Sequence, residues 1–181
     1  MKNRTKKIAL VFMAAAILMA CSSTKSLQEY YVDNAENPNF LSFDVPASMM
    51  NLEKIEMGET QKEALRSLKK LNIIAFRKTE INGAEYKVEK ENVNAILKNS
   101  KYTELMKMNT EFGKATVKFL GDDDAIDEVI IYGNNDDKGF ALVRVLGNNM
   151  NPAHMAQLLE VVQKSDFKGE GLDKLGDLFK D

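Results

Sequence analysis

The sequence predicts a two-layer α+β domain, with a mainly antiparallel sheet, a C-terminal four-stranded meander and helices packed on one face. The chain has 181 residues, of which 44% are hydrophobic and 29% charged, as in a globular protein with a core of its own. Its C-terminal half consists of β-type runs joined by short connections rich in Gly, Asn and Asp. Amphipathic helical patterns flank these runs.

Residues 26–52 begin with a helix-start pattern. Ser26 and Glu29 have the spacing of a capping box, which predicts a short helix from about Leu27 to Asn34. Apolar and polar residues then alternate, which predicts a strand over 40–45 with its apolar residues on one face. Pro46 ends this strand and can open a helical turn.

Residues 60–99 alternate between helical and strand patterns. Thr60 and Glu63 form a second capping-box pattern, which predicts an amphipathic helix that ends near Leu71. The apolar run 73–76 predicts a short buried strand. The turn at Asn82-Gly83 precedes a helix predicted from about Val88 to Asn99.

The C-terminal half predicts a meander, since its connections are too short to hold crossover helices. Its four strands are predicted over 102–108, 114–120, 128–132 and 140–146. Asn151 and Pro152 then suit the N-cap and first position of a helix. Leu172, Leu175 and Phe179 allow one more short helix in the tail.

The first 20 residues have the pattern of an export signal. A basic stretch with four Lys or Arg residues precedes an uncharged apolar run from Ile8 to Ala20. This run is shorter than the roughly 20 residues of a membrane-spanning helix. The run ends in Leu18-Met19-Ala20-Cys21, which resembles the cleavage box of bacterial lipoproteins.

Cys21 is therefore the predicted lipidation site. Its thiol takes a diacylglycerol group, and its amine, freed by cleavage of the signal, takes an acyl chain such as palmitate. The alternative is an ordinary signal peptide or short anchor with an incidental cysteine. The predicted organisation is a signal peptide over 1–20, a lipidated tether with a short helix over 21–36, and a single α+β domain over 37–181. Two or more acyl chains anchor a protein stably in a membrane.

Removal of the signal makes the domain acidic. Residues 21–181 hold 21 Lys or Arg and 27 Asp or Glu, so their formal charge is −6. An acidic, exported domain is a poor nucleic-acid binder. Ser22 stands where Asp would favour retention in the inner membrane, and no acid precedes Glu29. We therefore expect the protein at the periplasmic leaflet of the outer membrane.

The order of these features resembles the domain-of-unknown-function 4252 family of bacterial lipoproteins. The resemblance rests on the signal with Cys21, the strand over 40–45, the segment 102–106 (YTELM), and a hydrophobic meander followed by a Leu-rich helix. It covers nearly all of the mature chain and implies an exported lipoprotein. It implies no catalytic residues, because the family has no established activity.

An acidic cluster is the one candidate cation site. Asp122, Asp124 and Asp127, with neighbouring Asp123 and Glu128, could offer carboxylate oxygens to a hard cation such as calcium. A solvated hairpin turn explains these residues better, and we expect no metal or cofactor. His154 is the only histidine, and a surface or cap-adjacent position explains it better than a role as general base.

These observations favour a lipid-anchored envelope protein that binds an envelope protein or a small ligand without catalysis. One alternative is a carboxylate-based envelope hydrolase that uses acids such as Asp44, Glu104 or Asp127. Another is a regulatory or sensory partner in an envelope-stress system. Two carboxyl groups facing each other across a cleft would favour the hydrolase.

Overall fold

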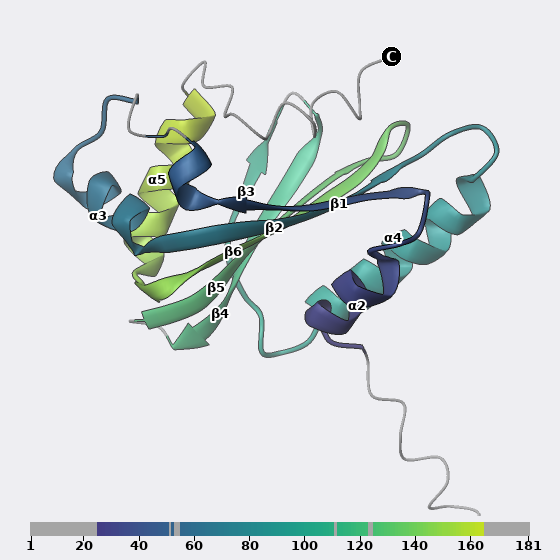
Figure 1. The fold of residues 1–181 in the computed structure, drawn as a ribbon, viewed down its shortest axis with the longest axis horizontal. Helices are drawn as coiled ribbons and strands as arrows, with labels where there is room; N and C mark the ends of the chain where they lie inside the picture. The colour runs from purple at the N-terminus through teal and green to yellow at the C-terminus, as the bar shows by residue number, and fades with distance from the viewer. Residues whose placement is uncertain (1–24, 51, 53–54, 111, 123–124, 165–181) are drawn as a thin grey trace, which may run out of the picture.

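The fold is a six-stranded antiparallel sheet with helices packed against it (Figure 1). The computed structural model describes residues 25–50, 52, 55–110, 112–122 and 125–164. The helices are α2 (Leu27–Asn34), η1 (Ala47–Met50, a 3-10 turn), α3 (Glu59–Ser67), α4 (Gly83–Leu97) and α5 (Pro152–Lys164). The strands are β1 (Phe40–Pro46), β2 (Leu68–Arg77), β3 (Thr103–Asn109), β4 (Lys114–Asp122), β5 (Ala125–Asn135) and β6 (Gly139–Met150).

The strand order is β1-β2-β6-β5-β4-β3, and every neighbouring pair is antiparallel. The predicted α+β class and the C-terminal meander are therefore confirmed. β1 and β2 extend the meander on the β6 side, so β1 and β3 are the two edge strands. None of the helices among the described residues has the length and apolarity needed to span a membrane.

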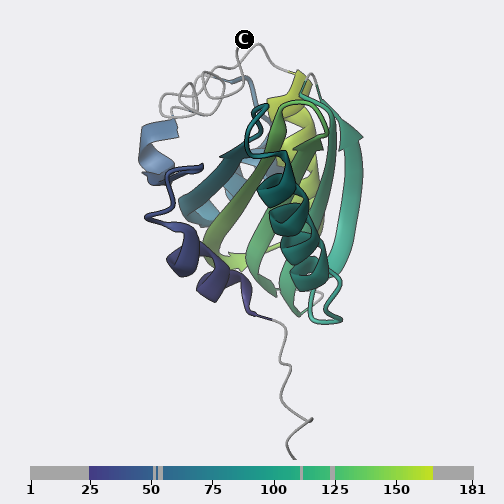
Figure 2. The same cartoon turned by 90° about the vertical axis from the view of Figure 1, so that its right-hand side faces the viewer.

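The two faces of the sheet each carry a hydrophobic cluster. On one face, the aromatic side chains of Phe76 and Phe140 stack with ring centroids 5.7 Å apart and pack beneath α2 and α4. On the other face, Ile73 and Val129 belong to a cluster with Met155 and Leu158 of α5. Figure 2 shows α4 crossing in front of the sheet, with α5 behind it.

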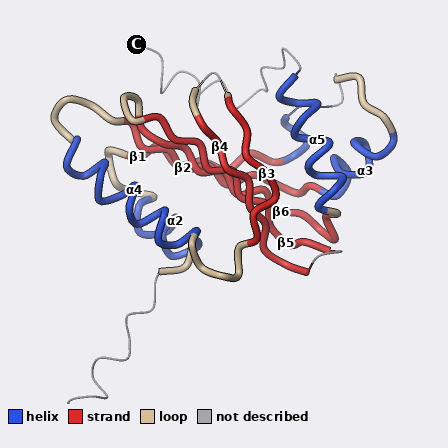
Figure 3. Tube along the Cα trace, turned by 180° about the vertical axis from the view of Figure 1, so that it is seen from behind, coloured by secondary structure: helices blue, strands red, loops and turns tan. Residues whose placement is uncertain are grey.

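The placement of the helices differs in one detail from the sequence expectation. Figure 3 shows α2 with α4 on one side of the sheet and α3 with α5 on the other. Neighbouring residues of β2 explain this division, because Ile73 and Ile74 point to opposite faces and both are fully buried. A strand that is apolar on both faces requires cover on both.

Several predicted boundaries are confirmed, and three are wrong. The capping box at Ser26 is present, and α5 begins at Pro152 after Asn151, whose side chain accepts a hydrogen bond from the backbone of His154. The capping box at Thr60 is absent, because α3 starts earlier with Gly58 as its N-cap. β2 begins at Leu68, within the predicted helix, because pairing with β1 and β6 favours the extended form.

α4 also begins earlier than predicted, at Gly83 instead of about Val88. Val88 is mostly exposed, so it does not mark the start of the buried helical stripe. The predicted inner residues Val93, Ile96 and Leu97 are all buried. The predicted tail helix lies outside the described residues.

Candidate functional site

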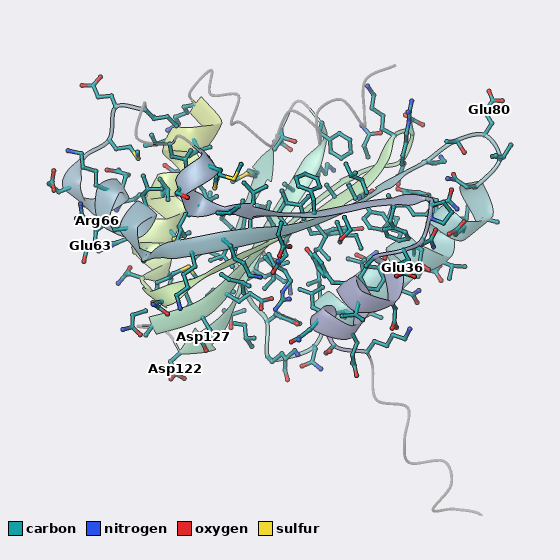
Figure 4. All side chains as sticks on the ribbon, in the orientation of Figure 1. Glu36, Glu63, Arg66, Glu80, Asp122 and Asp127 are labelled. Carbon is teal, nitrogen blue, oxygen red and sulfur yellow. The ribbon has the colours of Figure 1, made fainter. Side chains whose placement is uncertain are left out.

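The predicted lipidation and cation residues lie at or beyond the limits of the described chain. Cys21 and Asp124 are outside the described residues. Asp122 and Asp127 are exposed and lie at the same end of the sheet (Figure 4). Among the described residues, no three or more His, Cys, Asp or Glu side chains are grouped as metal ligands.

Two of the acids considered for a hydrolase, Asp44 and Glu104, lie far apart, and the third, Asp127, lies on the interior strand β5. Asp44 lies on edge strand β1 and Glu104 on the opposite edge strand β3. Strands lie about 4.8 Å apart, which puts these two edges roughly 20–25 Å from each other. Asp44 instead pairs with Lys70, at 3.2 Å, and Glu104 with Lys107, at 3.2 Å. Carboxyl groups of a glycosidase-like site lie within about 10 Å of each other, so these two do not form one.

His154 joins two helices. Its Nδ1 atom lies 3.5 Å from a carboxylate oxygen of Glu63 on α3, and its side chain is half-buried. His154 occupies the first turn of α5, as the sequence predicted. This contact gives the histidine a packing role between α3 and α5.

Among the residues that the structure describes, the most buried charged group is Glu128, which lies with Arg144 on the face that α2 covers. Arg144 donates two hydrogen bonds to the carboxylate, with Nε at 3.0 Å and Nη2 at 2.5 Å. The side chains of Glu128 and Arg144 are only 6% and 14% exposed. Burial alone would lower the pKa of Arg144, but the hydrogen bonds and charge of Glu128 outweigh burial and raise it.

Tyr31 of α2 covers this ion pair. The guanidinium carbon of Arg144 lies 5.6 Å from the centre of the Tyr31 ring. The Tyr31 hydroxyl is within hydrogen-bonding distance of two backbone oxygens, that of Leu142 at 2.7 Å and that of Asn72 at 3.1 Å. Tyr31 thus ties α2 to the centre of the sheet and helps to shield the ion pair from solvent.

A pocket of about 350 Å³ lies on the same face, beside the C-terminal end of α4. We call it the lysine pocket, because Lys98, Lys114 and Lys118 line it. Lys98 is the C-cap of α4, and the other two are on β4. Side chains alternate along a strand, so Lys114, Thr116 and Lys118 share one face of β4.

The lysine pocket combines positive charge with an unpaired polar group. The ammonium groups of Lys98 and Lys114 form no ion pair or hydrogen bond within the described part of the chain, whereas that of Lys118 donates to the Leu97 carbonyl at 2.7 Å. Tyr132 also lines the pocket, and its buried hydroxyl has no hydrogen-bond partner among the described residues. A buried, unpaired hydroxyl costs about 1–3 kcal/mol of stability.

The remaining walls of the lysine pocket are one carboxylate, one amide and apolar surface. Glu104 is the only acidic residue of the lining, and its carboxylate forms an ion pair with Lys107. Asn134 is held by its oxygen, which lies 3.1 Å from the Tyr86 hydroxyl. Leu97 and the ring of Tyr132 supply apolar area. The pocket therefore has an excess of positive charge in a chain whose acidic residues outnumber its basic ones.

Sequence reasoning missed both the ion pair and the lysine pocket. Glu128 was grouped with the exposed acids of the preceding turn, although it stands opposite Leu146 within the sheet. The alternation of Lys114, Thr116 and Lys118 was a usable signal for a cationic face of one strand. The approach of Lys98 depends on how α4 crosses the sheet, which no local pattern specifies.

Fold and pocket together define a small α+β protein with one antiparallel sheet, helices against both faces and a cationic pocket beside α4. The family model of DUF4252, a domain of unknown function, matches residues 30–158. The match covers more than half of the chain, so the chain belongs to this family. It extends from α2 into α5 and includes the whole sheet. No curated protein and no solved structure matches the chain.

Proposed function

We propose that this protein is a lipid-anchored protein of the bacterial cell envelope that binds a ligand or an envelope protein without catalysing a reaction. The observation that carries the anchor is the sequence of residues 2–21, in which a basic stretch, an apolar run and Leu18-Met19-Ala20-Cys21 follow one another. The proposed location is the periplasmic side of the outer membrane.

The length of the tether supports a role close to the membrane. α2 begins at Leu27, six residues after Cys21. Six extended residues reach about 20 Å, so a lipidated Cys21 would hold the start of α2 within that distance of the bilayer. A domain held this closely is suited to partners or ligands of the envelope, and its acidic charge argues against nucleic acid.

Two features support binding in place of catalysis. The lysine pocket is a concave site with converging polar groups, which is the usual form of a ligand site. Of the three acids that the sequence offered for hydrolysis, Asp44 and Glu104 lie on opposite edges of the sheet, and Asp127 lies on the interior strand β5. The proposal therefore assigns no catalytic residue.

Radiolabelled palmitate tests the anchor directly. The full chain and its Cys21→Ser variant are expressed in a Gram-negative bacterium grown with labelled palmitate, and the membranes are fractionated. We expect label and outer-membrane recovery for the full chain, and neither for Cys21→Ser. A matched Ser22→Ala variant should be labelled normally. Equal membrane recovery of the full chain and of Cys21→Ser, with no label in either, would overturn the anchor.

A further inference from the structure

We infer that the lysine pocket binds a small organic molecule through a phosphate group. This inference deepens the binding role proposed above, and it does not require a lipid on Cys21. It rests on the position, charge and burial of the groups that line the pocket.

The positive charge of the pocket is available to a ligand. Lys98 and Lys114 are exposed, and their ammonium groups have no ion-pair partner among the residues that the structure describes. Lys118 donates to the Leu97 carbonyl and keeps two further N–H donors. The pocket thus holds three ammonium groups and one carboxylate, that of Glu104, which also pairs with Lys107. Its net positive charge favours an anion of more than one negative charge.

The donors suit a phosphate better than a lone carboxylate. The lining has three lysines and a threonine hydroxyl, and a phosphate group carries up to two negative charges where a lone carboxylate carries one. Lysine ammonium groups act as compact point charges and bind phosphate oxygens from several directions. Thr116, which lies between the two lysines of β4 on the same face, adds a neutral donor.

The size and the apolar wall indicate an organic part beside the phosphate. A volume of about 350 Å³ is larger than a phosphate ion needs and lies in the range of small-molecule sites. Leu97 and the ring of Tyr132 offer apolar surface to the rest of the molecule.

Calorimetric titration tests the inference with inorganic pyrophosphate as the probe and the full chain in mild detergent as the protein. We expect binding at one site per chain, weakened about tenfold or more by Lys98→Gln and by Lys114→Gln, as for the loss of one charge-assisted contact. Lys114→Arg should retain most of the affinity. The control is Lys69→Gln, since Lys69 is an exposed lysine on β2, which β6 and β5 separate from β4.

Thr116→Val, which keeps the side-chain volume, gives an independent readout in the same titration. We expect it to weaken pyrophosphate binding while the melting temperature of the free protein stays close to that of the parent, because the substitution removes a neutral donor from the lining of the pocket. A lower affinity caused only by loss of folding would lower the melting temperature as well. Unchanged affinity in Thr116→Val, together with unchanged affinity in Lys114→Gln, would overturn the site.

Two further probes separate the sources of the phosphate. Vesicles of phosphatidylglycerol that compete with pyrophosphate, when phosphatidylcholine vesicles do not, would assign the phosphate to an anionic lipid headgroup. Pyrophosphate binding without such competition would assign it to a soluble phosphorylated molecule. Two results would contradict the inference: a protein that binds citrate but not pyrophosphate, or a Lys69→Gln variant whose pyrophosphate affinity falls as much as that of Lys98→Gln and Lys114→Gln. Failure of these titrations leaves palmitate labelling of Cys21 unaffected, so the two proposals fail separately.

Discussion

Removal of Glu128 is the substitution with the largest expected effect on stability. Glu128→Ala leaves the guanidinium of Arg144 largely buried, beside the Tyr31 ring, without its carboxylate partner. Loss of one partner of a buried ion pair costs about 3–5 kcal/mol, because the other charge stays desolvated. Two charge-assisted hydrogen bonds, at 3.0 and 2.5 Å, are lost here, and each contributes about 1.5–3 kcal/mol. We therefore expect the free energy of unfolding to fall by about 3–5 kcal/mol.

Urea unfolding followed by circular dichroism measures this change, with an unaltered m value as the sign that the unfolded state is unchanged. The control is Glu104→Ala, because Glu104 forms an exposed pair with Lys107 and should contribute less than about 1 kcal/mol. The double variant Glu128→Leu/Arg144→Met should recover most of the loss, since no charge stays buried. A loss of less than about 1 kcal/mol for Glu128→Ala would refute the reasoning.

Three further predictions concern the N-cap of α2, Gly139 and Tyr132. Ser26→Ala removes the N-cap hydrogen bond of α2 and should lower the free energy of unfolding by about 1 kcal/mol in urea titrations, whereas no change would show that the capping box is not formed. Gly139 has φ +125°, and an added Cβ would lie 2.0 Å from the Phe76 carbonyl oxygen. Gly139→Ala should therefore lower the free energy of unfolding by at least about 2 kcal/mol. A melting temperature equal to that of the parent would contradict this conformation. Burial, aided by the negative charge of Asp136, raises the pKa of Tyr132 to about 12, and the folded state therefore prefers neutral tyrosine. The contribution of neutral Tyr132 to stability is complete below about pH 10, the ordinary tyrosine pKa, and is lost as the pH rises toward 12. In urea unfolding at increasing pH, Tyr132→Phe should therefore lose less stability between pH 10 and 12 than the parent. An equal loss in the two proteins would contradict this prediction.

Local patterns predicted the elements that local interactions decide. The helix over Leu27–Asn34 was predicted with both its ends, because Ser26 and Glu29 form a reciprocal cap within one turn. The meander was predicted because its connections are too short for anything but hairpins. The strand over 40–45 was predicted from its alternation and extends one residue further, to Pro46.

Tertiary contacts decided the features that the sequence did not predict. Residues 68–72 suit either a helix end or a strand, and pairing with β1 and β6 places them in β2. The ion pair of Glu128 and Arg144 joins residues on neighbouring strands, so its partner cannot be chosen without the register. Lys98 reaches the lysine pocket only because the C-terminal end of α4 lies beside β4.

The mass of the N-terminal peptide of the protein, purified from bacterial membranes, tests the proposed anchor most directly. We expect a peptide that begins at Cys21 and carries the added mass of a diacylglycerol group and an N-linked acyl chain. The peptide from the Ser22→Ala variant should carry the same modification. An unmodified Cys21 within a peptide that still includes residues of the apolar run, or an N-terminus at any other residue, would contradict the lipid anchor.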